Sequence, residues 1–417
     1  MAGERIEVNG TAYAWPRQPL VVVCIDGGDP AYLEHGFAAG LIPNIHRFAS
    51  EGFHGTADGS MPSFTCPNNM SIVTGGPPAL HGISGNFYLD RATGEPVAMT
   101  GPELLRADSV LAAFSRAGAR VVSITAKDKL RRQLQRGMDL ANGSASFSSQ
   151  CADACTLQEN GIEDVLGLVG QPLPDMYSAE LSLFVLDAGI RLLEEHRPGI
   201  LYLSLTDFVQ HAHAPAEPEA ERFYAAMDAR FGRLAELGAA VALTADHGMT
   251  DKSDETGAPR VIWLQDVLDE AFGERAARVI CPITDAFVGH HGALGGFVRV
   301  YCSDGLAPQA VAELARGLPG VARAWLGPEA AAELRQPLDR EGDVAVMGDA
   351  RTVIGARQQD HDLSGLKGAR LRTHGSLTEA RVPFILSRRL RDDYAARAAT
   401  GPLNSFELFD YALNGLA

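Results

Sequence analysis

Aspartate and histidine residues recur at short spacings in four segments of this chain. They are IDGGD with Asp26, TDFVQHAH with Asp207 and His211, TADHGM with Asp246 and His247, and RTHGS with His374. Carboxylate and neutral imidazole groups suit zinc, with iron and manganese as weaker candidates, because no thiolate accompanies them. A single buried histidine or a single aspartate at a strand end is more commonly structural, but four such segments together predict a metal site.

The spacing within these segments bears on how many ions they hold. Asp207 and His211 are four residues apart, so one helical turn would place both on the same face. Asp246 and His247 are adjacent and point to opposite sides at a strand end. They therefore serve either two different ions or one ion through a kinked backbone. Two metals a few Å apart would explain why so many ligands are present.

A hydroxyl residue, Thr65, stands in the segment MPSFTCPNNMSIVTG, which spans residues 61–75. Its commonest role would be a helix N-cap, with Pro67 in the first helical turn. The alternative is a nucleophile, which a metal must activate because the pKa of a threonine hydroxyl is too high for unaided attack. A helix N-terminus would add positive potential for an anionic substrate. Cys66 is a less favoured nucleophile, because a free thiol beside zinc is more commonly inert packing or an unwanted ligand.

Lysine is rare in this chain. Of 36 basic residues only four are lysines, at 127, 129, 252 and 367, and two of them lie in TAKDKLRR. We interpret Lys127 and Lys129 as substrate contacts. In a loop after a strand their i, i+2 spacing would let both point to one side, whereas on a helix they would diverge.

Short apolar runs predict the elements that position these residues. They span 20–25, 120–125, 200–205, 240–245 and 382–386, with helical patterns between them. Such runs predict an α/β fold with a mostly parallel sheet between helix layers, whose site lies beyond the carboxyl ends of the strands. We expect a core at 15–260 and 365–417, a smaller α+β cap at 265–360, and a partial cap insertion near 130–175.

Composition and charge exclude several classes of partner. The net charge is 36 minus 52, or -16, and no run of basic residues suggests a nucleic-acid partner. Apolar runs are far shorter than the roughly 20 residues that span a bilayer, and residues 1–19 lack an apolar signal-peptide centre. We therefore expect a cytoplasmic protein with no membrane partner and a small-molecule substrate. A homodimer is compatible with the sequence but is not indicated by it.

We do not expect the remaining histidines and cysteines to bind the metal. Six scattered cysteines form no disulfide framework, and the Cys151/Cys155 pair lacks the second pair that a zinc site of cysteines requires. His290, His291 and His361 have ligand character but fall in or beside the expected cap. For these three we favour an exposed or structural role.

The motifs IDG, TCPN followed by SIVTG, DFVQH, ADHGM and THGS occur in this order along the chain. In this arrangement the chain resembles the alkaline phosphatase superfamily, and within it the nucleotide pyrophosphatase/phosphodiesterase branch, over about residues 20 to 410. Sulfatases are excluded because no arginine follows Cys66-Pro67 at their Pro-x-Arg position. Thr65 also differs from the serine of the main alkaline phosphatases and the independent phosphoglycerate mutases.

The resemblance implies a set of roles. One zinc ion is held by Asp207, His211 and His374, and a second by Asp26, Asp246 and His247 with the oxygen of Thr65 close to it. Asn86 binds a phosphoryl oxygen, and Lys127 and Lys129 match basic residues of phosphonate-cleaving members of the branch. The implied activity is zinc-dependent hydrolysis of the carbon–phosphorus bond of phosphonoacetate through a phosphothreonine. The alternatives are a nucleotide pyrophosphatase/phosphodiesterase or phosphomonoesterase using the same two-zinc site, and a non-catalytic phosphonate or phosphate sensor.

Overall fold

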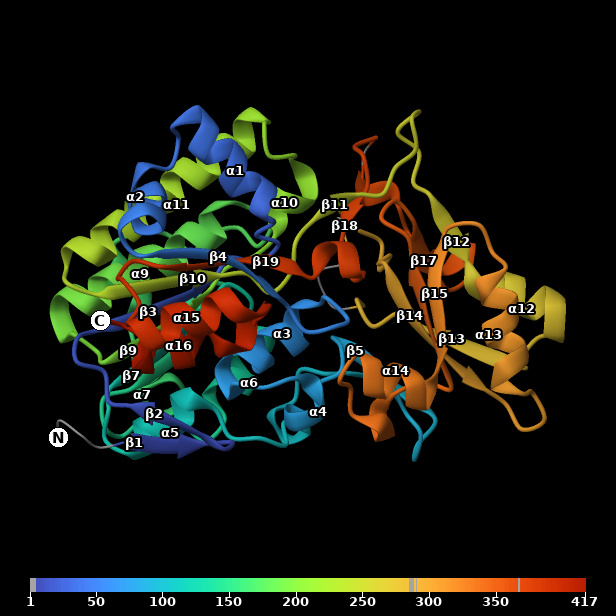
Figure 1. Cartoon of the computed structure of the whole chain (residues 1–417), viewed down its shortest axis with the longest axis horizontal. Coiled ribbons are helices and arrows are strands. Elements are labelled where there is room, and N and C mark those ends of the chain that lie inside the picture. The colour runs from blue at the N-terminus through green and yellow to red at the C-terminus, as the bar shows by residue number, and fades with distance from the viewer. Residues whose placement is uncertain (1–4, 285–288, 290, 367) are drawn as a thin grey trace.

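An eight-stranded sheet forms the centre of the larger part of the molecule (Figure 1). The computed structural model describes residues 5–284, 289, 291–366 and 368–417. In spatial order the strands are β20 (Leu403–Asn404), β4 (Phe53–Asp58), β19 (Arg381–Leu386), β10 (Ala240–Thr244), β3 (Leu20–Cys24), β9 (Ile200–Ser204), β7 (Val121–Thr125) and β8 (Ala145–Ser148). Each predicted apolar run forms a strand of this sheet.

All strands of this sheet run in one direction except β19, which is antiparallel to both β10 and β4. The fold is therefore α/β with a mostly parallel sheet, as the sequence predicts. The apolar run in β19 does not reveal its direction, because a strand buried on both faces has the same composition whether it is parallel or antiparallel.

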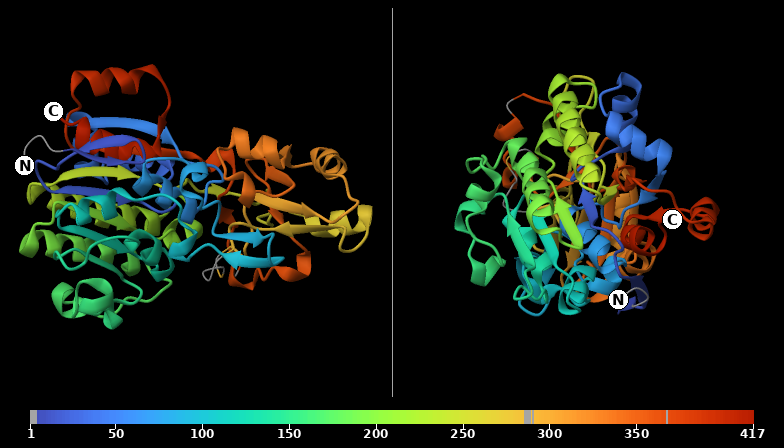
Figure 2. Two further views of the ribbon diagram at one scale, coloured as in Figure 1. Left: turned by 90° about the horizontal axis from the view of Figure 1, so that it is seen from below. Right: turned by 90° about the vertical axis from the view of Figure 1, so that its left-hand side faces the viewer.

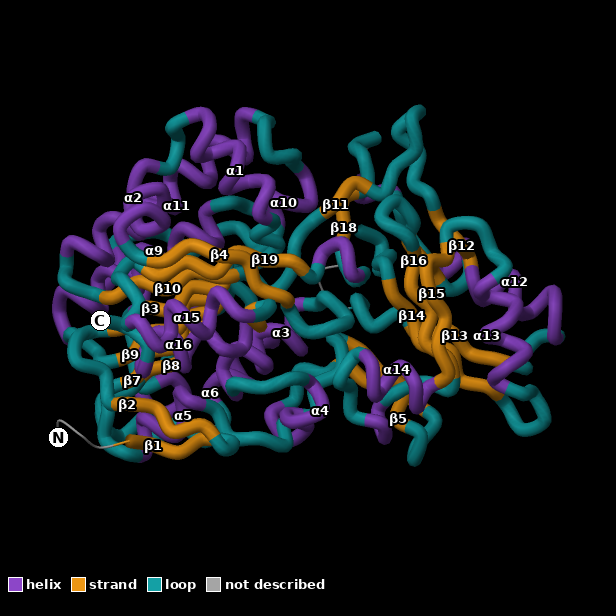
Figure 3. Tube along the Cα trace, viewed as in Figure 1, coloured by secondary structure: helices purple, strands orange, loops and turns teal. Residues whose placement is uncertain are grey.

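Helices cover both faces of the sheet because alternate strand residues point to opposite sides (Figure 3). Val21 and Val23 pack with one helix layer, while Leu20 and Val22 pack with the other. The first layer contains α1 (Pro30–Ala39), α2 (Pro43–Glu51), α8 (Val165–Val169), α9 (Glu180–His196) and α11 (Pro218–Glu236). The second contains α3 (Thr65–Thr74), α5 (Val110–Arg116), α6 (Asp128–Gln135), α16 (Leu408–Asn414) and the hairpin of β1 (Arg5–Val8) and β2 (Thr11–Ala14). Among the described residues, no helix has the length and apolar character needed to cross a bilayer.

A second, smaller unit lies at one end of the molecule, and strand β1 and the C-terminus lie toward the opposite end (Figures 1 and 2). Its antiparallel sheet has the order β13 (Ala277–Ile280), β14 (Phe297–Cys302), β16 (Val344–Gly348) and β15 (Val321–Leu326). Helices α12 (Leu264–Phe272), α13 (Pro308–Arg316) and α14 (Gly327–Glu333) pack with this sheet in a separate apolar core. Two strand pairs complete the unit, β12 (Val261–Trp263) with β17 (Val353–Gly355) and the hairpin β5 (Phe87–Asp90) with β6 (Glu95–Ala98). That this unit acts as a cap stays a prediction.

The segment 130–175, where we expected a partial cap insertion, instead contributes to the main sheet and its core. Its serine-rich stretch forms the edge strand β8, which pairs in parallel with β7. Ala145 and Phe147 of β8 lie in the same apolar cluster as Val165 of α8. Local composition did not reveal this strand because its place is fixed by pairing with β7 rather than by an apolar pattern of its own.

Candidate metal centre

Three adjacent parallel strands bring aspartates to one edge of the main sheet. Asp26 follows β3, Asp246 follows β10, and Asp207 follows β9 as the N-cap of α10 (Phe208–Ala212). Because β10, β3 and β9 are neighbours, their carboxyl ends meet. The turn after Asp26 needs glycine. Gly27 has a φ of +68°, and a Cβ there would lie 3.1 Å from the Cβ of Asp207.

His374 reaches the same edge by another route. Because β19 is antiparallel, its beginning lies at the edge where the parallel strands end. The segment before it forms β18 (Arg372–Thr373), which pairs with β11 (Thr250–Asp251), and then the short helix η7 (Leu377–Glu379). His374 lies between β18 and η7.

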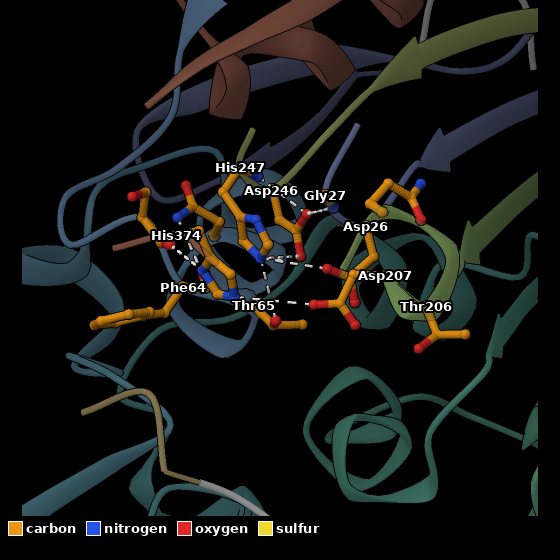
Figure 4. A network of polar contacts seen from close by, with 12 residues as sticks. Asp26, Gly27, Phe64, Thr65, Thr206, Asp207, Asp246, His247 and His374 are labelled. Atoms are coloured by element: carbon orange, nitrogen blue, oxygen red, sulfur yellow. Dashed lines mark hydrogen bonds and ion pairs between the residues drawn. The ribbon is translucent and has the colours of Figure 1, made fainter. Parts of the chain in front are cut away.

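The six Asp and His side chains form two buried groups of three, shown in part in Figure 4. Asp207, His211 and His374 make up the first group, and Asp26, Asp246 and His247 the second. Within each group the candidate ligand atoms lie within 4.8 Å of one another. In the first, Nε2 of His211 is 2.9 Å and Nε2 of His374 is 3.8 Å from Oδ2 of Asp207. In the second, Nε2 of His247 is 3.3 Å from Oδ1 of Asp26 and 3.7 Å from Oδ2 of Asp246.

The three histidines share one arrangement of their ring nitrogens. Nδ1 of His211 lies 2.6 Å from the carbonyl oxygen of Arg372, Nδ1 of His374 lies 2.7 Å from that of Ser63, and Nδ1 of His247 lies 2.9 Å from that of Gly248. A carbonyl oxygen only accepts, so each Nδ1 carries the hydrogen. In the neutral ring the lone pair is then on Nε2, the atom that faces the carboxylates. The Nε2 lone pair and the carboxylate oxygens are both acceptors, so a cation between them would be favourable. A histidine that binds a metal through Nε2 carries its hydrogen on Nδ1 in the same way.

The charge balance of the second group also fits a divalent cation. Both carboxylate oxygens of Asp26 are buried without a hydrogen-bond donor among the described residues. Burial and the neighbouring Asp26 raise the pKa of Asp246 well above its ordinary value. Burial opposes protonation of His247, but the charges of Asp246 and Asp26 raise its pKa to about 9. Both shifts mean that, without a metal ion, protons offset the charge of the two adjacent carboxylates, and a divalent cation bound by the carboxylates and Nε2 of His247 would replace those protons.

Thr65 lies against the second group at the beginning of a buried helix. Its Oγ1 is 3.5 Å from Nε2 of His247. Helix α3 begins at Thr65 itself, and the extended residue Phe64 is the N-cap, without a side-chain cap hydrogen bond. The alternative of Thr65 as N-cap is therefore wrong by one position. The backbone enters the helix one residue earlier than the proline and the polar run indicate.

Three asparagines hold the turn that carries Thr65. Asn86 Oδ1 accepts a hydrogen bond from the backbone N–H of Cys66 at 3.0 Å, and its Nδ2 donates to the carbonyl of Ile283 at 3.3 Å. Asn68 bonds both backbone groups of Ser60. Asn69 donates to the carbonyl of Thr65 at 3.0 Å and to Oδ2 of Asp246 at 3.4 Å. Asn68 and Asn69 are positioning residues that sequence reasoning missed, and their only signal was two adjacent amide side chains directly after Pro67.

Lys127 and Lys129 do not lie together in a loop. Lys127 is the extended N-cap of α6, and Lys129 is in the first turn of that helix. The expectation of a loop was wrong because the helix begins directly after β7, with Asp128 favourable in its first turn. The ammonium of Lys127 is buried and donates to Oδ1 of Asp207 at 3.1 Å, beside the first metal group.

His291, for which we favoured an exposed or structural role, lies beside the first metal group. His291 is buried, and its ring stacks 5.3 Å from that of His211. Its sequence neighbours are glycine and histidine, so only tertiary packing reveals this position. His361 has the structural role that we expected, because its ring nitrogens bond the backbone of Ala356 and Gly292. His290 lies outside the described residues.

The cysteines do not join either candidate metal group among the described residues. Cys151 and Cys155 are partly exposed and unbridged. Burial raises the pKa of Cys155 to about 11, which disfavours the thiolate that a metal would need. Cys66 is buried beside Thr65.

The fold and site define an α/β protein with an alkaline phosphatase-like core and two Asp/His groups beside a threonine at a helix N-terminus. The family model described as type I phosphodiesterase / nucleotide pyrophosphatase matches residues 20–377. The chain therefore belongs to this family. An uncharacterised pyrophosphatase/phosphodiesterase of Schizosaccharomyces pombe is 26% identical over 265 residues, or 60% of this chain. That match spans 48% of the relative, so the chain corresponds to about half of its length.

Solved structures give a similarity over the whole chain. Phosphonoacetate hydrolase from Sinorhizobium meliloti 1021, in complex with phosphonoformate, is 44% identical with a TM-score of 0.93, and each chain is covered at 100%. Its complex with phosphonoacetate aligns at 43% identity with the same TM-score and coverage. The resemblance to a phosphonate-cleaving member of the branch is thus confirmed. Murine ectonucleotide pyrophosphatase / phosphodiesterase 5, inactive and in complex with AMP, is 16% identical over 96% of each chain with a TM-score of 0.64, and shares the fold.

Proposed function

We propose that this protein hydrolyses the carbon–phosphorus bond of phosphonoacetate to acetate and phosphate, with Thr65 as nucleophile. The observation that carries the proposal is the buried ammonium of Lys127, 3.1 Å from Asp207 at the edge of the candidate metal centre. Cleavage of a P–C bond leaves charge on carbon, and a nearby cation is needed to stabilise it. The similarity over the full chain to a phosphonoacetate hydrolase supports the same substrate class.

Two divalent cations complete the proposed site. Asp207, His211 and His374 would hold one, and Asp26, Asp246 and His247 the other, with Thr65 adjacent to the second. Imidazole and carboxylate donors without thiolate favour zinc. When bound, the two ions would stabilise the alkoxide of Thr65 and the negative charge on the phosphoryl oxygens.

Thr65 attacks phosphorus in the first half of the reaction. A bond forms between its Oγ1 and phosphorus, the P–C bond breaks, and the electron pair moves to the departing carbon. The substrate carboxylate delocalises this pair as an enediolate, which Lys127 stabilises electrostatically; Lys129, in the first turn of α6, stays a proposed second contact. Asn86, beside the Cys66 amide, has an amide hydrogen for a phosphoryl oxygen. The carbon then takes up one proton, which balances the proton that Thr65 has lost, and acetate leaves.

Water completes the reaction in the second half. It attacks the phosphorus of phosphothreonine, the bond to Oγ1 breaks, phosphate is released and Thr65 recovers its proton. The helix N-terminus at Thr65 favours the phosphoryl group in both halves because its partial positive charge faces an anion. Because the net charge of the chain is -16, nearby cations must outweigh its repulsion of an anionic substrate at the site.

The rival activity is hydrolysis of a nucleotide or another phosphate ester, which the family membership favours. That activity would need exposed aromatic rings to hold a base. Phe64 is fully buried against His374, and Tyr88 is buried beneath Arg340. Phe87 keeps partial exposure, and so does Phe208, whose ring lies 6.3 Å from that of Tyr177, so these rings remain available for such a role. What favours the small phosphonate over a nucleotide is the buried Lys127 ammonium beside Asp207, which a phosphate-ester leaving group does not need.

The test is release of phosphate and acetate from phosphonoacetate by purified zinc-loaded protein. We expect equimolar products, and no products after chelation until zinc is restored. Bis(p-nitrophenyl) phosphate and p-nitrophenyl phosphate serve as the comparison substrates. A protein that holds two zinc ions and cleaves the esters but not phosphonoacetate would refute the proposal in favour of the rival.

A further inference from the structure

Two separate loops carry ligands of the two candidate metal groups. The loop after β10 carries Asp246 and His247, and the loop before η7 carries His374. The rings of His247 and His374 stack face to face, with centroids 3.5 Å apart and planes inclined by 8°. The separation of the two metal groups therefore depends on how these loops are fixed to one another.

The backbone joins the loops only briefly. Strand β11 pairs with β18 through Thr250 with Thr373 and Asp251 with Arg372. A ladder of this length is weak on its own and does not fix the residues beyond it. Other contacts must hold Gly248 and Ser376, which lie next to His247 and close to His374 respectively.

Glu379 supplies these contacts to both loops at once. Its Oε1 accepts hydrogen bonds from Nζ of Lys252, at 2.8 Å, and from the hydroxyl of Thr250. Its Oε2 accepts from the backbone N–H of Ser376 at 2.9 Å and from the Ser376 hydroxyl at 2.8 Å. Its own carbonyl accepts from the N–H of Gly248 at 2.6 Å. One carboxylate thus bonds the loop of His247 through one oxygen and the loop of His374 through the other.

Lys252 is the charge partner that this carboxylate requires. Both side chains are fully buried, and Nζ of Lys252 also donates to the carbonyl of Ala350 at 3.1 Å. The Lys252 backbone N–H bonds the carbonyl of Leu371, which again ties the two loops together. A buried ion pair contributes little net stability compared with a well-packed apolar pair, so its use here points to a geometric role.

We propose that Glu379, paired with Lys252, is the positioning residue that sets the placement of His247 relative to His374 and so the spacing of the two metal ions. The metal role rests on the proposed function, whereas the contacts are features of the fold. Each oxygen of Glu379 accepts from two donors. A glutamine has only one acceptor oxygen, and its amide hydrogens would face either Lys252 or the Ser376 amide, so one loop would be released.

The test compares Glu379→Gln with a matched variant in the second unit. Arg299 and Glu341 form another fully buried ion pair, with Nε and Oε1 2.6 Å apart, which does not contact the metal loops. Zinc affinity and stoichiometry are measured by competition with a chromophoric chelator, and folding by thermal unfolding. We expect Glu379→Gln to weaken zinc binding at least tenfold at one or both sites. Glu341→Gln should lower the melting temperature comparably but bind zinc as the wild type does.

A double variant separates positioning from stability. In Glu379→Gln the buried ammonium of Lys252 loses its charge partner. Adding Lys252→Met removes that ammonium and should recover much of the melting temperature, while zinc affinity stays low. Recovery of wild-type zinc affinity in the double variant would overturn the proposal. So would a Glu379→Gln protein that loses melting temperature only, as Glu341→Gln does.

A milder change keeps the test informative if Glu379→Gln does not fold. Thr250→Val removes one hydrogen bond to Glu379 without altering charge, and should weaken zinc binding several-fold with little change in melting temperature. Unaltered zinc affinity in Thr250→Val would count against the proposal. Zinc binding is measured without substrate, so this test is independent of the proposed activity. If the variants bind zinc normally while the wild type cleaves phosphonoacetate, only the positioning role fails. If the wild type does not cleave phosphonoacetate while the variants differ in zinc affinity, only the proposed activity fails.

Discussion

Replacing Lys127 with methionine tests whether a buried cation selects carbon–phosphorus cleavage. The Lys127 side chain is only 6% exposed, so its charge is little screened by solvent. Two unit charges about 4 Å apart at an effective dielectric of about 20 interact by about 4 kcal/mol. Losing that stabilisation of the departing enediolate would slow phosphonoacetate turnover about 10³-fold. An aryl phosphate leaves as a phenolate that needs no such cation, so we expect a loss below about tenfold there.

The ratio of the two losses is the decisive quantity, because Lys127 also bonds Asp207 and its removal affects the metal group for both substrates. Both kcat/KM values are measured on protein of verified zinc content. Arg131→Met is the matched control. Arg131 is a buried cation on the same helix, but it pairs with Asp128 and Glu159 instead of the metal group. Equal losses on phosphonoacetate and p-nitrophenyl phosphate in Lys127→Met would refute the reasoning.

Two further predictions concern helix α3 and its surroundings. Thr65→Ala should reduce turnover by at least about 10⁴-fold while the protein keeps two zinc ions, since its hydroxyl is the proposed nucleophile; loss of zinc together with activity would instead indicate a structural role. His81, buried against Ser71 of α3, has a pKa lowered to about 3 by burial and by Arg340. Below about pH 6.5 the unfolded state binds a proton at His81 and the folded state does not. The free energy of unfolding therefore decreases by about 1.4 kcal/mol per pH unit between about pH 6.5 and 3. Urea unfolding at pH 7.5 and 5 should therefore show the wild type losing about 2 kcal/mol more than His81→Gln; equal losses would contradict this pKa.

The sequence was sufficient to predict the edge of the sheet at which the candidate site lies. Asp26, Lys127, Asp207 and Asp246 each follow an apolar run, and parallel strands bring the ends of such runs together. The THGS motif identifies His374 as a candidate ligand, but the argument from parallel strand ends does not place it at this edge of the sheet. It reaches the edge because β19 is antiparallel, and the direction of a fully buried strand leaves no trace in its composition.

Other parts of the site depend on contacts between distant segments. His291 faces His211 across a long stretch of chain, and Glu379 meets Lys252 in the same way. Neither pair has a periodicity or a local motif. The tautomers of His211, His247 and His374 are likewise fixed by backbone carbonyls that only the fold brings into reach. Residue types and strand ends therefore predict which groups take part, while tertiary packing decides how they are oriented.

The position of Thr65 shows why an N-cap role and the proposed nucleophile role exclude one another. A serine or threonine at the N-cap would turn its oxygen inward to bond a helix N–H, and would partly neutralise the positive end of the helix. Phe64 occupies the cap position and has no side-chain acceptor, so this does not occur. Asn86 takes the Cys66 amide instead, and Thr65, as the first helical residue, directs its hydroxyl toward His247. With the hydroxyl one residue inside the helix, its oxygen is not used for capping and stays available for the proposed attack on phosphorus.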